Sequence, residues 1–480
     1  MDGITKQLTS DVAEQLMEDI TSVEDVNYDL LYRMAPGDIA ELQQHWVRKR
    51  FEQLRPHIPM LDRLAREQGV DKVNDIDDIA PLLFAHTVYK SYPLSYLEKN
   101  RFDKLTKWMS GLTTTDLSGV DAAGIESIDD WLDLVDEKSD LMIFHTSGTT
   151  GKLSFIPRTK AQGRIVAKLA GIRLRDWFGG NSRADMLRHH RPIINPGYRY
   201  GAATAQRLGV LQAEMFAGGF DNVLYLYPDR RFSADMQSLA GRIRNAEAKG
   251  ELGALKVPQA LLRRREELLE LEAQRPQDVA RFLEEAVNRF HGQDVFIAAV
   301  YSLLFDWAQD GLEKGQSGVF GAGTFVNTGG GAKGAKLPDN WKDMIRGYLG
   351  IKTFDDVYGM TESMSVAVRC EHDKYHFSPL TVVFPLDPKT GKLLPRRDGT
   401  TGRMAFFDLI PDSYWAGFVS GDEVTFSGWE RPCACGRTGL YAEPAIRRYS
   451  EKEGGDDKVM CSGAPEAHDR AATFLADYAG

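Results

Sequence analysis

The chain has 480 residues, of which 42% are hydrophobic and 27% are charged. These ordinary globular values exclude a disordered chain, a fibrous repeat and a small disulfide-stapled domain. With 59 basic and 69 acidic residues the formal net charge is -10, which argues against general binding to nucleic acid or anionic membranes. At roughly 150 residues per domain, the length predicts two or three domains.

Residues 1–135 are polar, with apolar positions at three- and four-residue spacing in stretches such as DVAEQLMEDI. This periodicity predicts a helical N-terminal region. The first 16 residues carry acids and no apolar stretch of signal-peptide length, and the longest apolar run, 295–305, is too short to span a bilayer. We therefore expect a cytoplasmic protein without a membrane span.

Residues 136–370 alternate helical stretches with strand-like runs, namely LMIFHT, NVLYLY, VFIAAVY, SGVFGA and TFDDVYG. Such alternation predicts an α/β core with parallel-rich sheets flanked by helices. A charged helical insertion lies near 250–290, where we expect Pro276 to separate two helices. Residues 371–453 are rich in Gly, Pro and Asp and predict a β-rich subdomain, which leaves 454–480 as a short C-terminal segment.

The sequence His145–Lys152, HTSGTTGK, directly follows the first of these strands. Gly148 and Gly151 permit a tight turn, hydroxyl and backbone N–H groups can surround phosphate oxygens, and Lys152 adds positive charge. The spacing of a Walker A loop is absent. The sequence therefore predicts a phosphate-binding loop, with an ordinary Ser/Thr/Gly turn as the alternative.

Three further strings follow in order: NTGGGAKG at Asn327–Gly334, YGMTE at Tyr358–Glu362 and VSGD at Val419–Asp422. With the first loop they span about 280 residues, and in this order the sequence resembles the adenylate-forming superfamily, whose members activate carboxylates with ATP. GGGAKG, YGMTE, Cys370 with His376, and CACGR are most similar to the acyl-protein synthetase and phenylacetate–CoA ligase types.

The resemblance implies a role for each string. Lys152, Thr361 and Glu362 would be the catalytic residues, with Thr361 at the α-phosphate and Glu362 on Mg²⁺. Asp422 would bind the ribose hydroxyls, and Arg437 the ribose or a phosphate. The other implied nucleotide-binding residues are Thr146, Ser147, Gly148, Thr149, Thr150, Gly151, Gly329, Gly330, Gly331, Tyr358 and Gly359.

Cys370 and His376 lie six residues apart with His372 between them, and Cys433 and Cys435 follow about sixty residues later. Three thiolates and one imidazole suit a tetrahedral structural zinc site. The alternative is a set of buried reduced cysteines with surface histidines. The resemblance to phenylacetate–CoA ligases favours zinc, with Cys370, His376, Cys433 and Cys435 as ligands and His372 as the substitute.

The segment 454–463 resembles the hinge string that precedes the lid domain of this superfamily, with Gly455 in place of the usual arginine. Only 17 residues follow Gly463, and none of them is a lysine that could replace the lid lysine. Three explanations stay open: charge from Lys152, Lys333 or Lys458, residues borrowed from a partner subunit or carrier, or a longer natural chain. Cys461 is either an acyl acceptor or an inert hinge cysteine.

The residues between 191 and 200 combine two tyrosines and two arginines, which could line an acyl pocket or form a surface loop. The sequence thus predicts an ATP- and magnesium-dependent ligase that converts a carboxylic acid to an acyl- or aryl-adenylate. The acyl group then passes to a thiol of CoA, a carrier protein or a partner enzyme. The alternative is a non-catalytic nucleotide-binding subunit of a larger acyl-transfer complex. The acid and a homo-oligomeric state stay open.

Overall fold

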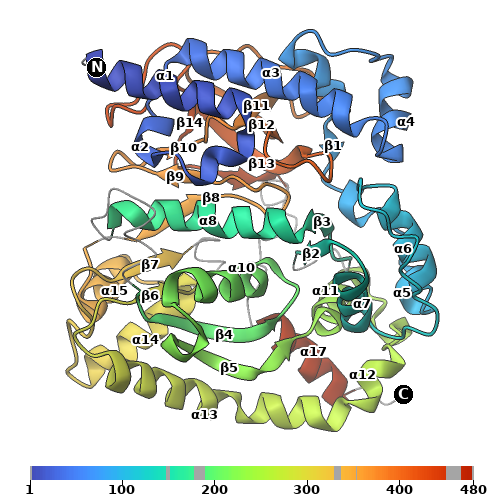
Figure 1. Cartoon of the computed structure of the whole chain (residues 1–480). Coiled ribbons are helices and arrows are strands. Elements are labelled where there is room, and N and C mark those ends of the chain that lie inside the picture. Colours follow the sequence, from blue (N-terminus) through green and yellow to red (C-terminus); the bar gives the residue numbers. More distant parts are fainter. Residues whose placement is uncertain are drawn as a thin grey trace.

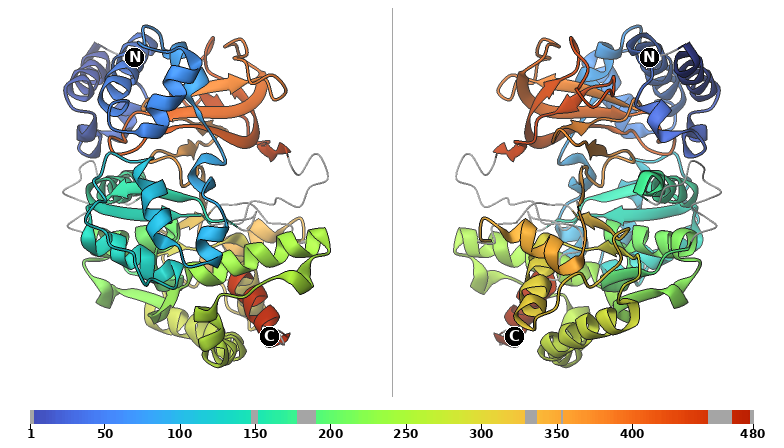
Figure 2. Two further views of the ribbon diagram at one scale, coloured as in Figure 1. Left: turned by 90° about the vertical axis from the view of Figure 1, so that its right-hand side faces the viewer. Right: turned by 90° about the vertical axis from the view of Figure 1, so that its left-hand side faces the viewer.

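The computed structural model of the chain describes residues 3–146, 152–177, 190–328, 337–352, 354–449 and 466–477. The molecule has two halves (Figure 1): one combines the N-terminal helices with antiparallel strands, and the other contains the parallel strands with their helices. The two ends of the chain lie at opposite ends of the molecule (Figure 2). The predicted α/β class is confirmed.

The parallel half contains strands in the order β5-β4-β6-β7-β8. Their bounds are β4 (Ile193–Gly201), β5 (Val223–Phe232), β6 (Phe296–Ala298), β7 (Phe325–Thr328) and β8 (Asp355–Tyr358). Each adjacent pair is parallel. The predicted strands at NVLYLY, VFIAAVY and TFDDVYG are confirmed, and the first two are apolar runs typical of strands buried on both faces of a parallel sheet.

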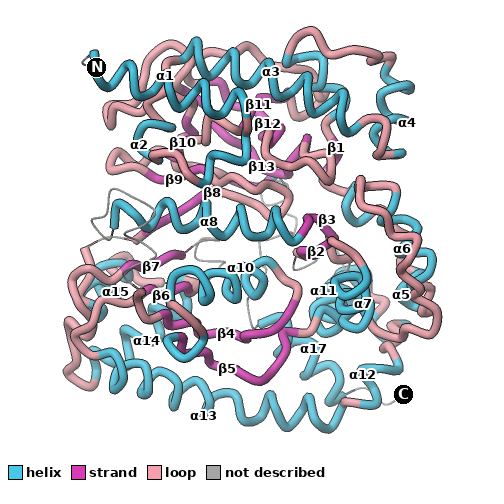
Figure 3. Tube along the Cα trace, in the orientation of Figure 1, coloured by secondary structure: helices cyan, strands magenta, loops and turns pink. Residues whose placement is uncertain are grey.

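Helices accompany these strands on either side of the sheet (Figure 3). They are α8 (Lys160–Trp177), α10 (Thr204–Gln212), η4 (Ala213–Ala217), η5 (Phe220–Asn222), α11 (Ala234–Lys249), η6 (Leu252–Ala254), α12 (Gln259–Arg263), α13 (Arg265–Phe290), α14 (Tyr301–Glu313) and α15 (Trp341–Leu349). Phe282, Ala286 and Phe290 of α13 pack with Trp307 of α14 and Tyr348 of α15 in one core. None of the helices in the described ranges has the length and apolar character needed to cross a membrane.

The sheet continues without a break into the antiparallel half, in the order β8-β9-β10-β14-β13-β12-β11. The strands are β9 (Ala367–Arg369), β10 (Tyr375–His376), β11 (Thr381–Leu386), β12 (Thr400–Asp408), β13 (Gly417–Ser427), β14 (Tyr441–Ala442) and β15 (Arg447–Arg448), the last pairing with β13. The predicted boundary at 370/371 therefore falls between two strands of one hydrogen-bonded path.

The N-terminal region is helical, as predicted: residues 3–90 cover the antiparallel half, and the helices between 95 and 138 lie beside the parallel half. Its elements are α1 (Gly3–Glu18), η1 (Ile20–Glu24), α2 (Tyr28–Leu31), α3 (Pro36–Leu54), α4 (Pro59–Gln68), η2 (Ile76–Leu82), β1 (Phe84–Ala85), η3 (Val88–Lys90), α5 (Ser95–Glu98), α6 (Phe102–Ser110) and α7 (Ile128–Lys138). Arg50 of α3 is buried and donates to the carbonyls of Leu409 and Ile410. One core joins the elements from α1 to η3 to the antiparallel strands, and a second core contains the buried residues of α5, α6 and α7.

The predicted strand at LMIFHT is confirmed as β2 (Leu141–His145), but it pairs antiparallel with β3 (Phe155–Thr159). The HTSGTTGK sequence thus connects two strands of a hairpin. A single parallel bridge from His145 to Ala203 links this hairpin to the segment after β4. This link places the hairpin at the carboxyl end of the parallel strands.

Two local expectations are wrong. The run SGVFGA forms no strand, because Val319 and Phe320 donate their N–H groups to the carbonyls of Tyr348 and Leu349 at the end of α15. Pro276 does not separate two helices, since α13 is continuous across it. Buried residues on both sides of the proline, Leu268 and Phe282, hold this helix against its neighbours despite the missing N–H donor.

The helices α7 and α11 cap each other through a buried carboxylate pair, Asp129 and Asp235. Asp235 accepts the N–H groups of Ile128 and Asp129, and Asp129 accepts the N–H of Ala234 and the hydroxyl of Ser233. Burial and the neighbouring Asp129 raise the pKa of Asp235 to about 8. Asp235 therefore accepts N–H groups in the first turn of α7, and Asp129 accepts one in the first turn of α11. These N–H groups have no hydrogen-bond acceptor within their own helix.

The C-terminal helix α17 (Glu466–Asp477) packs on α11 and α13 in the parallel half. Ala471, Ala472 and Leu475 are fully buried in this contact. Arg265 donates to the carbonyl of Ala476. The predicted C-terminal segment therefore includes a helix docked on the body, while its hinge-like part, 454–463, lies outside the described residues.

Candidate functional site

The YGMTE sequence occupies the loop that leaves the carboxyl end of β8, and Thr361 in this loop meets Thr204 at the start of α10. Their hydroxyl oxygens are 2.8 Å apart. Since α10 follows the carboxyl end of β4, the two threonines bring together two strand ends of the parallel sheet. Crevices at this edge of open α/β sheets are the usual places for ligands. A side chain at Gly359 would collide with Val366 at 2.6 Å, so this tight loop requires glycine.

Two buried charged residues hold the backbone of the loop. Arg158 of β3 donates to the carbonyl oxygens of Thr361 and Ser363 at 2.5 and 2.6 Å. Asp408 of β12 accepts the N–H groups of Met364 and Ser365 at 2.9 and 2.8 Å. The loop backbone is therefore fixed before any ligand binds, which favours precise positioning of its side chains.

Glu362 in this loop is a buried carboxyl, 8% exposed. Burial raises its pKa, while the charges of Arg158, Lys90 and Arg448 act in the opposite direction. The hydroxyl of Tyr414 donates to the Glu362 carbonyl at 3.3 Å. A carboxyl that is buried and surrounded by cations is a functional-site candidate on electrostatic grounds.

Asp422 on β13 lies next to the YGMTE sequence, because it accepts the hydroxyl of Tyr358 at 2.8 Å. Arg448 on β15 pairs with its other oxygen at 3.4 Å. Burial, and then Asp422, raise the pKa of Tyr358, which keeps its hydroxyl a donor. The structure thus brings Tyr358, Thr361, Glu362 and Asp422 into one region.

The predicted phosphate loop is described only at its two ends. Thr146 forms a hydrogen-bonded pair with Ser154 across the hairpin, and Ser147, Gly148, Thr149, Thr150 and Gly151 lie outside the described residues. Lys152 donates to the carbonyl of Tyr92 at 2.7 Å, and burial lowers its pKa. Its predicted contact with phosphate stays a prediction. Gly329, Gly330, Gly331, Lys333, Lys458 and Cys461 also lie outside the described ranges.

The residues near the predicted acyl pocket form strand β4 from Ile193 onward, so the surface-loop alternative is wrong for them. The rings of Tyr198 and Tyr227 are tilted to each other with centroids 4.6 Å apart, and the guanidinium of Arg199 lies 3.8 Å from the centre of the Phe220 ring. Their contact with an acid stays a prediction.

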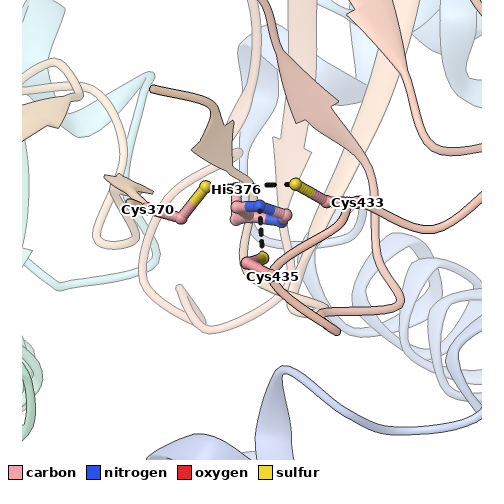
Figure 4. Close-up of side chains that lie close together, drawn as sticks. All are labelled: Cys370, His376, Cys433 and Cys435. Carbon is pink, nitrogen blue, oxygen red and sulfur yellow. Dashed lines mark hydrogen bonds between the residues drawn. The ribbon is translucent and has the colours of Figure 1, made fainter. Parts of the chain in front are cut away.

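The four predicted zinc ligands come together in a compact cluster (Figure 4). The donor atoms of Cys370, His376, Cys433 and Cys435, which we call the Cys/His cluster, all lie within 4.8 Å of one another. The Cys370 and Cys433 sulfurs are 4.0 Å apart, and Cys435 Sγ lies 3.3 Å from His376 Nε2. Tetrahedral zinc with Zn–S bonds of about 2.3 Å requires sulfur separations of about 3.8 Å. The substitute, His372, is exposed and lies outside the cluster.

The cluster is buried, and its electrostatics suit a bound cation. Burial lowers the pKa of His376 to about 3 and raises the pKa of Cys435 to about 12. The neutral imidazole is the form that ligates metals, and a metal would replace the thiol protons. Arg437 lies beside the cluster and over the Tyr32 ring, 5.3 Å from its centre. Its predicted nucleotide contact stays a prediction.

Five residues of this region were not predicted from the sequence. Arg158 carried a weak signal, because it is a lone charge in the apolar strand FIPRT. Thr204, Asp408, Tyr414 and Arg448 belong to no motif, and only the fold brings them to the loop. They lie on four different elements or connections, so local patterns could not identify them.

The sequence matches no protein-family model and no curated protein. Among solved structures, an open conformation of 2-hydroxyisobutyryl-CoA ligase in complex with 2-HIB-AMP and CoA aligns with 87% of this chain and 76% of its own, with a TM-score of 0.50 and 14% identity. The chain has the fold of this ligase. The same ligase in complex with R3-HIB-AMP has a TM-score of 0.48 at 13% identity, and the match covers 92% of this chain and 85% of the ligase. ATP-bound MatB from Rhodopseudomonas palustris has a TM-score of 0.34 at 15% identity, and the match covers 63% of this chain and 46% of MatB. The fold assignment rests on the first match.

Proposed function

We propose that the chain activates a carboxylic acid with ATP to form an acyl- or aryl-adenylate and transfers the acyl group to a thiol. The observation that carries this proposal is the clamped loop: Thr361 and Glu362 project from a backbone that Arg158 and Asp408 hold at the carboxyl end of the parallel strands. The fold shared with a ligase whose structure contains an acyl-AMP supports it.

In the first step a carboxylate oxygen of the acid attacks the α-phosphorus of ATP. The bond from this phosphorus to the bridging oxygen breaks, and pyrophosphate leaves with the electron pair. Such a transfer depends on positioning and charge neutralisation more than on a protein nucleophile. The Thr361 hydroxyl, held by Thr204, would bind an α-phosphate oxygen, and Asp422 would accept hydrogen bonds from the ribose hydroxyls.

Glu362 fits a magnesium ligand, because a carboxylate oxygen is the donor that Mg²⁺ prefers and a cation relieves the burial of its charge. When bound, Mg²⁺ would neutralise charge on the phosphates. In the second step the acceptor thiol loses its proton, its sulfur attacks the acyl carbon, and AMP leaves. The thiol belongs to CoA, a carrier protein or a cysteine of a partner enzyme. We keep the phenylacetate–CoA ligase and acyl-protein synthetase types as the proposed subgroups.

We also propose that the Cys/His cluster binds a structural zinc ion. The four donors fill a tetrahedral shell, so the site has no open position for a substrate. It would join the segments after β9 and before β14. Metal analysis of the purified chain should find about one zinc per chain.

The test of the activity is exchange of labelled pyrophosphate into ATP across a panel of fatty and aromatic acids. We expect one acid class to support exchange, because adenylate formation is reversible without an acceptor. Addition of CoA or a phosphopantetheine-bearing carrier then identifies the thiol. Binding of ATP without exchange for any acid would contradict the proposal and favour the non-catalytic subunit.

A further inference from the structure

The carbonyl groups of three consecutive loop residues, Thr361, Glu362 and Ser363, are all bound by buried side chains. Arg158 donates to the first and the third, and the hydroxyl of Tyr414 donates to the second at 3.3 Å. Arg158 is 1% exposed and Tyr414 is fully buried. Because a peptide unit is planar, fixing these carbonyls fixes the peptide planes on both sides of Glu362. The direction in which its side chain leaves the backbone is therefore fixed as well.

The carboxyl of Glu362 also depends on these planes. It accepts a hydrogen bond from its own N–H, which lies in the same peptide plane as the Thr361 carbonyl. Burial raises the pKa of Tyr414 to about 12, so its hydroxyl keeps its proton and stays a donor at neutral pH. Loss of this hydroxyl would release the peptide plane that follows Glu362 and let the side chain change direction.

Tyr414 belongs to the connection between β12 and β13, which the N-terminal region holds in place. Thr113, after α6, forms an antiparallel bridge with Tyr414, and its hydroxyl donates to the carbonyl of Ser413 at 2.9 Å. The hydroxyl of Tyr89 donates to the carbonyl of Trp415 at 2.5 Å, and its ring lies 6.2 Å from that of Tyr414. The residue that holds Glu362 therefore has contacts with two separate parts of the N-terminal region.

The same connection is also bound by β3 and α8. The hydroxyl of Ser413 lies 3.1 Å from the carbonyl oxygen of Pro157 and 2.6 Å from the side-chain oxygen of Gln162. Gln162 is 3% exposed, and its amide donates to Asp412 at 2.6 Å. Because three parts of the molecule hold this short connection, Tyr414 can hold the Glu362 carbonyl in one place.

We propose that Tyr414 is a positioning residue that orients the Glu362 carboxylate toward magnesium, and that the N-terminal region supports catalysis through it. This inference rests on the proposed function. A ligand held in one orientation binds a metal ion more tightly than one that must first be ordered. Without the Tyr414 hydroxyl the affinity for Mg²⁺ should fall, whereas saturating Mg²⁺ should restore most of the turnover.

The test compares Tyr414→Phe with Tyr348→Phe, which removes the hydroxyl of a buried tyrosine in the core of the parallel half. In pyrophosphate exchange we expect Tyr414→Phe to raise the KM for Mg²⁺ about tenfold, as for the loss of one hydrogen bond, and to keep kcat within about threefold. Tyr348→Phe should leave both values unchanged.

A binding measurement gives a second readout that does not depend on turnover. Calorimetry should show that Tyr414→Phe weakens ATP binding about tenfold in the presence of Mg²⁺ and less than about twofold in EDTA. The difference is expected because, without the metal ion, the orientation of Glu362 contributes nothing to nucleotide binding. A substitution that only disturbs packing would weaken binding equally under both conditions.

Thr113→Val tests the contact with the N-terminal region, because it removes the hydrogen bond to Ser413 and keeps the shape of the side chain. We expect the KM for Mg²⁺ to rise about threefold. Thermal unfolding of each variant identifies misfolding. If Tyr414→Phe does not fold, the Mg²⁺ dependence of Thr113→Val decides whether the connection positions Glu362.

Several outcomes overturn the assignment. A wild-type KM for Mg²⁺ in folded Tyr414→Phe would show that Tyr414 does not position Glu362. Equal weakening of ATP binding with Mg²⁺ and in EDTA would show a general distortion of the site. Either result, with exchange by the wild-type chain, contradicts the positioning role alone. If the wild-type chain exchanges no pyrophosphate with any acid, the proposed function fails, and the assignment fails with it.

Discussion

The Cys/His cluster and the YGMTE loop are both buried polar sites, but they balance charge in different ways. In the cluster, three thiols and an imidazole face one another with a cation, Arg437, at their side, and we propose that a metal ion replaces the thiol protons. In the loop, the charges of Arg158, Lys90 and Arg448 already favour the ionised form of Glu362. We therefore propose that the cluster is a closed structural site, and that the loop exchanges a polyanionic ligand. Changes in the loop should therefore affect turnover, and changes in the cluster should affect stability.

The largest expected effect comes from Glu362→Gln, which removes the proposed magnesium ligand but keeps the shape of the side chain. We expect pyrophosphate exchange to fall about 1000-fold, as for the loss of a main charge-stabilising group. The thermal unfolding midpoint should change little, because the neutral amide costs less to bury than the carboxylate. Glu371→Gln, on an exposed residue, is the matched control. Wild-type exchange by the Glu362 variant would refute the magnesium assignment.

The next effect is that of Arg158→Met, which removes two charge-assisted hydrogen bonds to the loop carbonyls. We expect a loss of roughly 100-fold in exchange, because small displacements of positioned groups reduce rates by this order. The free energy of unfolding should fall by about 3 kcal/mol, since each such bond contributes about 1.5–3 kcal/mol. Chemical denaturation measures the second value. Full activity in a destabilised variant would show that the arginine only holds the fold.

The contrast between the two sites also explains what the sequence could predict. All four residues of the Cys/His cluster were identified, because cysteine and histidine are few and the ligand chemistry restricts their combinations. The strands that lead into HTSGTTGK and YGMTE were also predicted, whereas β7, which leads into NTGGGAKG, was not. The fold class followed from the alternation of these runs with helices.

The supports of the loop could not be predicted, because their signal is in the tertiary structure. Arg158 and Asp408 lie about 250 residues apart in sequence, and they bind backbone atoms of the loop. Because nearly every residue type has the same backbone groups, the sequence does not indicate these contacts. The antiparallel pairing of β2 was missed for the same reason, since an apolar run does not specify the direction of its neighbour. The run SGVFGA was predicted as a strand but forms a loop, which shows that buried apolar residues can also belong to loops.

A smaller effect on activity is expected from Cys433→Ser, which should break the Cys/His cluster. We expect zinc content to fall from about one ion per chain to near zero and the thermal midpoint to fall by several degrees, because metal binding contributes to folding free energy. Exchange at low temperature should stay within about threefold of the wild type, because the cluster is separate from the proposed nucleotide contacts. Ala434→Ser, between the two ligands, is the control. A large loss of activity in a well-folded variant would contradict the structural role.

The smallest effect concerns the carboxylate pair Asp129 and Asp235. In this pair a proton on Asp235 removes negative charge, the part that the proposed metal ion has in the Cys/His cluster and the arginines have at the YGMTE loop. The pKa of Asp235 is about 8 in the folded chain, against an ordinary value of 3.8. Between these pH values the folded state keeps a proton that the unfolded state has lost, so the stability contribution is complete below pH 3.8 and is lost as the pH rises through about 8. Asp235→Asn carries no such proton.

We therefore expect the wild-type free energy of unfolding to fall between pH 6 and pH 8.5 by more than that of Asp235→Asn. Urea unfolding at the two pH values measures this difference, and Glu247→Gln on the exposed surface of α11 should follow the wild type. The amide can still accept the two N–H groups of α7, so the variant should fold. Equal pH slopes in all three chains would mean that Asp235 is ionised in the fold. The pair would then need Arg231, which already binds Asp129, as its neutralising charge.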